Sequence, residues 1–268
     1  MTVVLSPDSP MLLFGCGNMG RAMLDGWLRA GLDPACFVVV DPFAHDLPAG
    51  ISHFDDSGKL GRKFATAVLA IKPQLFGGAA SDIELALNPD ALVFSILAGT
   101  RLATLEEALP VRQIVRLMPN LAAAIGKSPM GMFASAALDR VAIEQLVRPL
   151  GTSFWLASED QMDAVTALAG SGPAFVYRFI DALAQAGREL GLDAETALGL
   201  AASMVEGAAL LAANSGENPE ELARRVTSPS GTTAAGLSVL DDANALKNLV
   251  LATLTAARDR GAELAKAK

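Results

Sequence analysis

The stretch RRVTSPSGTTAAGL, residues 224–237, has residue types and a spacing that could hold a small anion. Pro229 ends one helical pattern, and a new pattern begins near Thr232 after a short turn. The first N–H groups of a helix have no partner inside it and, together with the helix dipole, attract anions. We therefore expect the N–H groups of Gly231, Thr232 and Thr233 to bind a substrate carboxylate, with the threonine hydroxyls as further donors. A helix-to-helix turn capped by Ser and Thr explains the same residues equally well.

A glycine-rich loop, GCGNMG at residues 15–20, follows an apolar run and opens a helical pattern. Its glycine spacing lets a backbone turn tightly and come close to a pyrophosphate at a helix N-terminus. The position directly after a strand makes this short pattern much more specific than it is alone. We predict that the loop binds a dinucleotide, and a glycine-rich turn without a ligand is the alternative. The residues expected to contact the cofactor here are Gly15, Cys16, Gly17, Asn18, Met19 and Gly20.

An acidic residue, Asp41, ends the second apolar run and follows Gly20 by 21 residues. A carboxylate at this position accepts a hydrogen bond from the 2′-OH of the adenosine ribose, and it repels a 2′-phosphate. The stretch DPFAHD offers no Arg or Lys that could hold such a phosphate. The cofactor is therefore NADH or NADPH, and Asp41 favours NADH. The alternative for Asp41 is an ordinary residue that starts a turn with Pro42.

Candidates for acid–base chemistry are scarce. The two histidines, His45 and His53, fall on the adenosine side of the nucleotide-binding half, where we expect them at the surface. Lys72 follows the third apolar run and could reach the site, although with Pro73 it could simply end the strand. Ser171 precedes a Gly-Pro helix start, which structural capping also explains. A substrate with a C=N bond would need at most one proton donor at nitrogen, and a threonine hydroxyl or a water could supply it.

Short apolar runs alternate with helical patterns in the first half of the chain, which is typical of an α/β doubly wound sheet. We predict buried parallel strands at residues 11–15, 37–41, 67–73, 91–99 and 113–120. Helical patterns between them include residues 19–30 and 75–87, and residues 131–136 and 152–156 could add strands around a helix at 138–150. The cofactor would lie along the carboxyl ends of these strands.

From about Ser158 the apolar runs stop, and long Ala- and Leu-rich helical patterns take over. We predict helices at residues 173–190, 193–213, 219–226, 232–240 and 244–266. Small residues lie on more than one face of these helices, which suits packing against the helices of another subunit. The sequence therefore predicts a Rossmann dinucleotide-binding domain at residues 1–157. It predicts an all-helical domain at residues 158–268, and the family resemblance given below implies that this domain binds the substrate and forms the dimer.

Composition limits the classes of partner. The net charge of −8 argues against a nucleic-acid partner, which would require a basic face. The two cysteines, Cys16 and Cys36, form no disulfide framework and indicate a reducing compartment. We recognise no apolar segment of about 20 residues and therefore expect no membrane span. The sequence predicts a cytoplasmic protein with a small-molecule substrate and no bound metal.

Five motifs occur in the order found in the pyrroline-5-carboxylate reductase family, and the sequence resembles that family from about residue 11 to residue 260. The motifs are GCGNMG, AIKPQ, RLMPN, LAGSGPAFVY and VTSPSGTTAAGL. The resemblance implies that NAD(P)H reduces the C=N bond of 1-pyrroline-5-carboxylate to give L-proline, the last step of proline biosynthesis. It also implies an N-terminal Rossmann domain and C-terminal helices that interlock between the two subunits of a homodimer. Such dimers often assemble further into decamers.

The resemblance also implies roles for single residues. Beyond the glycine loop and Asp41, the residues that would bind the cofactor are Ala70, Lys72, Pro73 and Asn120, with Lys72 and Pro73 on the nicotinamide side. The residues that would bind the substrate are Ser171, Gly231, Thr232 and Thr233. Thr233 aligns with the threonine proposed to interact with the ring nitrogen, and Ser228 matches a hydroxyl near the substrate. Thr233 and Ser228 are therefore the candidate catalytic residues.

Three motifs depart from the family pattern. Leu121 and Ala122 follow Asn120 where Thr-Pro is usual, Ala169 stands where Ser is common, and Ser230 stands where Gly is usual. These changes leave every group assigned to chemistry in place. They keep open the alternative that the substrate is another cyclic imine.

Two other functions also remain open. A β-hydroxyacid-type dehydrogenase has the same Rossmann-plus-helical layout, but its catalytic lysine lies early in the helical domain, where this chain has Val176. Arg178 lies nearby and cannot deprotonate to act as a base. A non-catalytic NAD(H)-binding protein would keep the glycine loop, but it would have no use for an anion-binding turn at residues 228–233.

Overall fold

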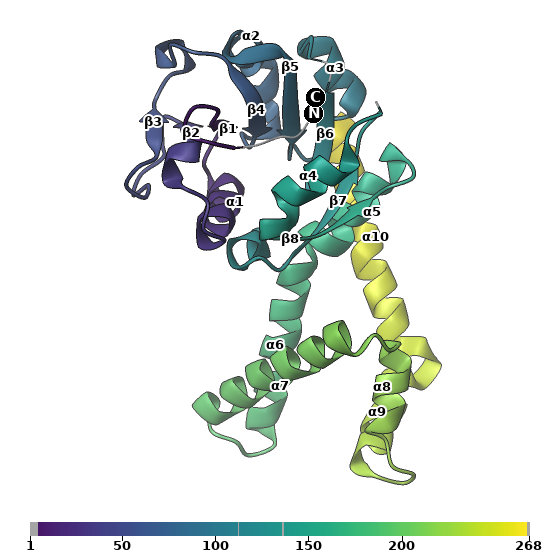
Figure 1. Cartoon of the computed structure of the whole chain (residues 1–268). Helices are drawn as coiled ribbons and strands as arrows, with labels where there is room; N and C mark the ends of the chain where they lie inside the picture. The colour runs from purple at the N-terminus through teal and green to yellow at the C-terminus, as the bar shows by residue number, and fades with distance from the viewer. Residues whose placement is uncertain (1–4, 112, 136, 267–268) are drawn as a thin grey trace. The chain divides into compact units, whose positions relative to one another are not determined.

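The computed structural model describes residues 5–111, 113–135 and 137–266. The chain divides into two compact units (Figure 1). The first runs to Ser171 and takes up the chain again at Ala257, and the second spans Gly172–Ala256. The predicted boundary between a dinucleotide-binding domain and a helical domain, after residue 157, stays a prediction.

An eight-stranded sheet forms the centre of the first unit, with strand order β3-β2-β1-β4-β5-β6-β7-β8. Neighbouring strands are parallel except for the antiparallel pair β6 and β7. The α/β doubly wound fold class is therefore confirmed. The strands are β1 Met11–Phe14, β2 Phe37–Val40, β3 Ser52–Phe54, β4 Phe64–Leu69, β5 Leu87–Ser95, β6 Gln113–Met118, β7 Ser128–Phe133 and β8 Gly151–Trp155.

Each face of the sheet is covered by helices. Alternate residues of β1 point to opposite faces: Met11 and Leu13 pack in a cluster with α1 and α4, whereas Leu12 and Phe14 pack with α2 and α3. Burial on both faces explains why the central strands are continuous apolar runs. The helices of this unit are α1 Asn18–Arg29, α2 Phe76–Ala86, α3 Leu102–Ala108, α4 Arg140–Val147 and α5 Met162–Val165.

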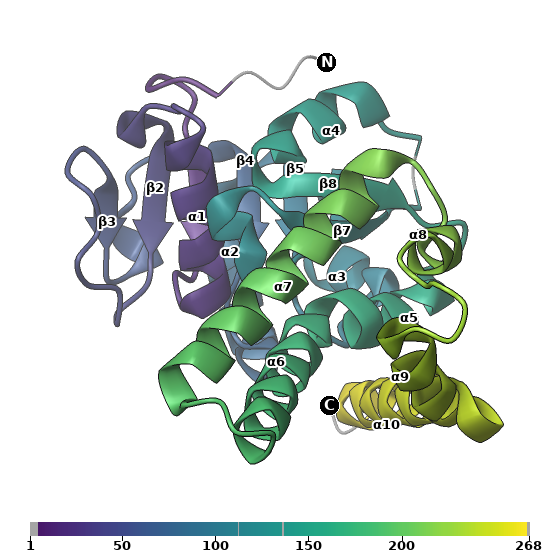
Figure 2. The same cartoon turned by 90° about the horizontal axis from the view of Figure 1, so that it is seen from below.

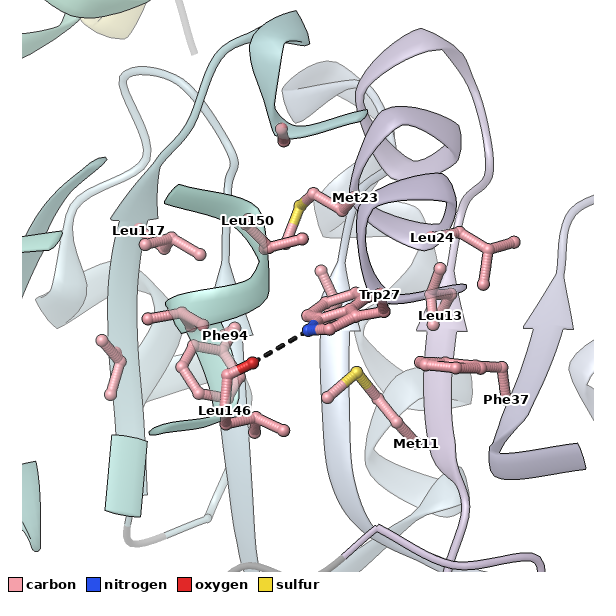
Figure 3. Close-up of a cluster of buried hydrophobic side chains, with 14 of the residues drawn as sticks. Met11, Leu13, Met23, Leu24, Trp27, Phe37, Phe94, Leu117, Leu146 and Leu150 are labelled. Atoms are coloured by element: carbon pink, nitrogen blue, oxygen red, sulfur yellow. Dashed lines mark hydrogen bonds between the residues drawn. The ribbon is translucent and has the colours of Figure 1, made fainter. Parts of the chain in front are cut away.

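Trp27 occupies the middle of the first of these clusters (Figure 3). Its ring stacks on Phe37, with the ring centroids 5.6 Å apart. The indole nitrogen donates a hydrogen bond to the carbonyl oxygen of Leu146 at 2.8 Å, so the one polar atom of the side chain is satisfied. This contact joins α1 to α4 on the same face of the sheet.

The second unit is entirely helical over its regular elements, as predicted. Its helices are α6 Gly172–Glu189, α7 Ala194–Ser215, α8 Pro219–Arg225, α9 Thr232–Asp241 and the first part of α10 Ala245–Lys266, whose residues from Ala257 onward belong to the first unit. α6 and α7 pack against each other (Figure 2). Short polar side chains fix two of the helix starts, because Asp193 accepts hydrogen bonds from the N–H groups of the first turn of α7 and Asn218 does the same for α8.

The helix α7 corrects one expectation. By length and composition it is apolar enough to cross a membrane, so the sequence does contain an apolar segment of the length that we did not recognise. Large apolar side chains remain exposed on this helix and its neighbours in the single chain, among them Leu198, Met204 and Leu211 on α7. Exposed apolar area of this extent marks a surface that another molecule or a membrane covers.

The Trp27 hydrogen bond gives a stability prediction. Trp27→Phe removes the donor and leaves the Leu146 carbonyl unpaired in the core, which costs about 1–3 kcal/mol. We expect the free energy of unfolding, measured by urea titration, to fall by that amount. Trp155→Phe is the matched control because the Trp155 indole donates to the exposed Glu144 carboxylate, and it should cost less than about 1 kcal/mol. Equal losses in the two variants would contradict this account of the core.

Candidate functional site

The loop between β1 and α1 passes very close to the end of β4. Gly15 has a φ of +98°, and a Cβ atom there would lie 2.7 Å from backbone atoms of Ala70. At Gly20 a Cβ atom would lie 2.6 Å from the carbonyl oxygen of Gly15. Both positions therefore require glycine for the backbone itself, which is the reason that the spacing of this loop was informative in the sequence.

Gly17 differs from these two glycines, because a Cβ atom there would meet nothing within 4 Å. Gly17 is the N-cap of α1, and no side chain caps the helix. The first N–H groups of α1 therefore face open space, as a pyrophosphate site requires. Packing within the chain does not explain the glycine at this position, whereas close approach of a ligand does.

Asp41 is fixed directly beside the loop. One carboxylate oxygen accepts a hydrogen bond from the N–H of Cys16 at 2.7 Å, and the other accepts from the N–H of Phe43 at 2.8 Å. The Asp41 carbonyl oxygen also lies 2.8 Å from Nε2 of His53 on β3. Each carboxylate oxygen keeps a free lone pair. The predicted ribose-binding carboxylate is therefore held in one orientation with acceptor capacity to spare.

A cavity of about 700 Å³ opens at the carboxyl ends of β1, β2 and β4, and we call it the Asp41 cavity. Its lining includes the glycine loop, Ala70 and Lys72, so much of the predicted cofactor site is brought together. Four carboxylates line it, on Asp41, Asp55, Asp56 and Asp82. Lys72 is the single cation among the lining residues, all of which are described.

A second cavity of about 570 Å³ also borders the loop, lined by Cys16, Asn18 and Leu121 among others. Phe43 lines both cavities and is 86% exposed. Sequence reasoning missed Phe43, Asp55 and the other acids of the Asp41 cavity. Asp55 and Asp56 follow β3, whose three residues are largely exposed, so no apolar run marked that strand.

Cys16 is unsuited to nucleophilic chemistry despite its place in the loop. Burial raises the pKa of its thiol to about 11, with the Asp41 and Asp25 carboxylates adding to the rise and Arg21 opposing it. The thiol therefore stays protonated at neutral pH, and the thiolate is the reactive form. Cys16 contributes to the site through its backbone N–H, which donates a hydrogen bond to the Asp41 carboxylate.

Asn120 lies just beyond β6 and is 6% exposed. Its side-chain oxygen accepts from the N–H of Ala122 and its amide nitrogen donates to the Ala169 carbonyl oxygen, both at 2.9 Å. Ala169 belongs to a π-helical turn, Thr166–Gly170, which leads directly to Ser171. The structure thus joins Asn120 to the segment that carries Ser171, a link that the sequence did not indicate.

The turn that precedes α9 is open for an anion, with one correction. The N–H of Gly231 donates to the Ser228 carbonyl oxygen at 3.0 Å, so the expectation that it is free was wrong. In the described part of the chain no hydrogen bond takes the N–H groups of Thr232, Thr233 and Ala234, and no side chain caps α9. The unpaired N–H groups therefore begin one residue later than predicted, because the N–H of the N-cap glycine closes the preceding turn.

The neighbours of Gly231 are closely packed. A Cβ atom at Gly231 would collide with the Ser228 hydroxyl, which places that hydroxyl against the N-cap of α9. Ser230, where the family usually has glycine, has a φ of +60°. This left-handed conformation costs a non-glycine residue about 1–2 kcal/mol. Ser230 thus holds a backbone conformation that glycine would adopt without this cost.

Curated relatives match most of the chain. The curated pyrroline-5-carboxylate reductase of Pseudomonas aeruginosa is 37% identical over 97% of this chain and 98% of its own length. The chain belongs to the pyrroline-5-carboxylate reductase family. Residues 159–264 match the model described as pyrroline-5-carboxylate reductase dimerisation. The predicted family resemblance is confirmed.

A solved pyrroline-5-carboxylate reductase and a solved pyrroline carboxylate reductase have the same fold. The enzyme from Coxiella burnetii superposes with a TM-score of 0.87 at 32% identity and covers 96% of this chain and 98% of that chain. The enzyme from Plasmodium falciparum, solved with NADP bound, superposes with a TM-score of 0.84 at 26% identity, covering 97% of this chain and 99% of that chain. The part matched to dimerisation contains the exposed apolar helices, Ser171 and the turn at 228–233. The roles of single residues stay predictions.

Proposed function

We propose that the protein is an NAD(P)H-dependent oxidoreductase that reduces the C=N bond of 1-pyrroline-5-carboxylate to L-proline, the last step of proline biosynthesis. The observation that carries the proposal is the identity of 37% with the Pseudomonas aeruginosa enzyme over nearly the whole of both chains. A β-hydroxyacid dehydrogenase is disfavoured, because Val176 stands where its lysine would be. A non-catalytic NAD(H)-binding protein would not account for the open turn at α9.

The residues of the loop and of the Asp41 cavity fit a nicotinamide dinucleotide. The open space at Gly17 and the free N–H groups at the start of α1 suit a pyrophosphate, and the cavity can hold a nucleoside. The proposed cofactor-binding residues are Gly15, Cys16, Gly17, Asn18, Met19, Gly20, Asp41, Ala70, Lys72 and Pro73. Asn120, which the resemblance also assigned to the cofactor, is not among them, because both ends of its amide are engaged by the chain itself. When bound, the reduced nicotinamide supplies a hydride to C5 of the pyrroline ring.

The turn before α9 is the proposed carboxylate site. The N–H groups of Thr232, Thr233 and Ala234 have no partner among the described residues, and together they offer three donors at the positive end of a ten-residue helix. Ser228 and Ser171 are further proposed substrate-binding residues. Thr233 would hydrogen-bond the ring nitrogen, which takes up one proton as C5 is reduced. Positioning of this kind accelerates a reaction without a strong general base.

The proposed assembly is a homodimer formed through the helices of residues 158–268, with residues 1–157 as the dinucleotide-binding domain. The match of residues 159–264 to a dimerisation model and the exposed apolar side chains of α6–α10 support this proposal. Further assembly of dimers into a decamer is the finer proposal. A cytoplasmic location is consistent with two cysteines that are buried and free.

Thr233 provides the first test. Loss of a hydrogen bond to a charged group costs about 1.5–3 kcal/mol, so Thr233→Ala should lower kcat/KM for the imine by at least about tenfold. The dissociation constant for NADH should stay within about twofold of the unaltered protein. Thr227→Ala is the matched control, since the Thr227 hydroxyl is already used by the Ala223 carbonyl at 2.6 Å. Equal losses in imine turnover and NADH binding, or an equal effect of the control, would argue against the assignment.

The Asp41 cavity predicts a preference for NADH. A 2′-phosphate would meet the fixed Asp41 carboxylate in a cavity where acids outnumber the single lysine. Arg21, the neighbouring cation, is already paired with Asp25 at 2.8 Å. We expect NADH to bind at least about tenfold more tightly than NADPH, which corresponds to about 1.4 kcal/mol of charge repulsion.

Fluorescence titration with both cofactors measures this ratio directly. Asp41→Asn should bring the two dissociation constants closer by about tenfold, because it removes the charge that opposes the phosphate. Asp46→Asn removes the same charge from a side chain that is 91% exposed, and it should leave the ratio nearly unchanged. Equal affinity of the unaltered protein for NADH and NADPH would refute the preference.

A further inference from the structure

The segment between the sheet and α6, residues 159–170, is held by hydrogen bonds near both of its ends. One comes from a residue of β6 and the other from a residue just after β6. At its start, a carboxylate oxygen of Glu159 accepts hydrogen bonds from the Arg116 guanidinium at 2.7 Å and from the N–H of Leu102 at 2.6 Å. Arg116 lies on β6 and is 4% exposed. This buried ion pair fixes where the segment begins.

The other tie is formed by Asn120, just beyond the carboxyl end of β6. The donation from its amide nitrogen to Ala169 is the contact that reaches the segment. The rest of Asn120 is held rigidly, since its side-chain oxygen accepts from Ala122 and its backbone N–H donates to the buried Ser128 hydroxyl at 2.9 Å. The side chain therefore acts as a fixed donor that meets one particular carbonyl.

That carbonyl lies in the π-helical turn Thr166–Gly170. The N–H of Ser171 donates to the Thr166 carbonyl oxygen at 2.9 Å, which closes the wide turn. π-Turns are rare within helices and are found frequently at functional sites. Ser171 is half-buried, and its hydroxyl has no hydrogen-bond partner among the described residues. A hydroxyl in this state is available to a ligand.

The position of this turn follows from the sheet. The carboxyl ends of β1, β4, β5 and β6 lie at one edge because these strands are parallel. The glycine loop and the Asp41 cavity occupy the same edge. Asn120 therefore connects the cofactor edge of the sheet to the backbone that carries Ser171.

We propose that Asn120 is a positioning residue that, through its hydrogen bond to Ala169, holds the π-turn where Ser171 meets the substrate. The inference rests on the proposed function for the identity of that substrate. It gives Asn120 a role different from cofactor binding, because both ends of its amide are engaged by the chain itself. Ser171 is the residue through which Asn120 acts.

Asn120→Asp is the sharpest variant for this proposal. It keeps the shape of the side chain and the acceptor for Ala122, but it places an oxygen against the Ala169 carbonyl. We expect KM for 1-pyrroline-5-carboxylate to rise at least fivefold, while the dissociation constant for NADH changes less than twofold. Asn120→Ser, which removes the reach to Ala169 without adding charge, is the second variant if the first fails to fold.

Glu159→Gln is the matched control, because it weakens the tie at the other end of the same segment. A merely structural role of Asn120 predicts that Glu159→Gln raises KM as much as Asn120→Asp at equal loss of thermal stability. The positioning role predicts that only the Asn120 variants do so. A double-mutant cycle with Ser171→Ala completes the test: once the serine hydroxyl is gone, Asn120→Asp should raise KM less than twofold further. Full additivity of the two changes would overturn the proposal.

Hydrogen exchange separates this inference from the proposed function. Asn120→Asp should speed exchange of the Ser171 amide, which closes the π-turn, whereas Glu159→Gln should leave it unchanged. Unchanged exchange in Asn120→Asp overturns the positioning role whether or not the protein reduces this imine. Absence of imine reduction by the unaltered protein, with the exchange result as expected, overturns the proposed substrate alone. Weaker NADH binding in Asn120→Asp would instead indicate contact with the cofactor.

Discussion

The close approach of the glycine loop to the end of β4 is the constraint on which the site depends. Gly15 and Gly20 allow the loop backbone to pass within contact of Ala70, where any larger residue would collide. This crossing places the open N-terminus of α1 at the carboxyl edge of the sheet. Asp41 then secures the loop through the Cys16 N–H, so the same carboxylate that would select the cofactor also holds the loop in place.

A second set of contacts fixes a segment outside the sheet, residues 159–170. Arg116 on β6 and Asn120 just after β6 hold this segment, Arg116 at its start and Asn120 near its end. Both contacts use buried polar groups, whose loss is costly because no water replaces the missing partner. The segment therefore ends in a defined π-turn, and this turn sets the position of Ser171.

Much of the fold could be predicted from the sequence because its central strands are buried on both faces. Such strands are continuous apolar runs, and β1, β2 and β6 lie close to where those runs predicted them. β3 was missed because it is three residues long and largely exposed, and the short α3 was also missed. The apolar character of α7 was missed because interspersed small residues kept its pattern from reading as one run.

The site was predictable where the backbone demands a residue type and unpredictable where a contact joins distant segments. The glycine loop and the turn before α9 belong to the first kind. The bond from Asn120 to Ala169 crosses 49 positions of the chain, and no local pattern announces it. The hydrogen bond of Gly231 to Ser228 depends on turn geometry, so the free N–H groups were placed one residue too early.

The measurement that tests the central claim most directly is the initial rate of cofactor oxidation by purified protein with 1-pyrroline-5-carboxylate, using NADH and NADPH in parallel and identifying the product. The account predicts oxidation of cofactor in equal amount to the L-proline formed, with the faster rate at low concentration for NADH. Tight NADH binding with no formation of L-proline from this imine would contradict it.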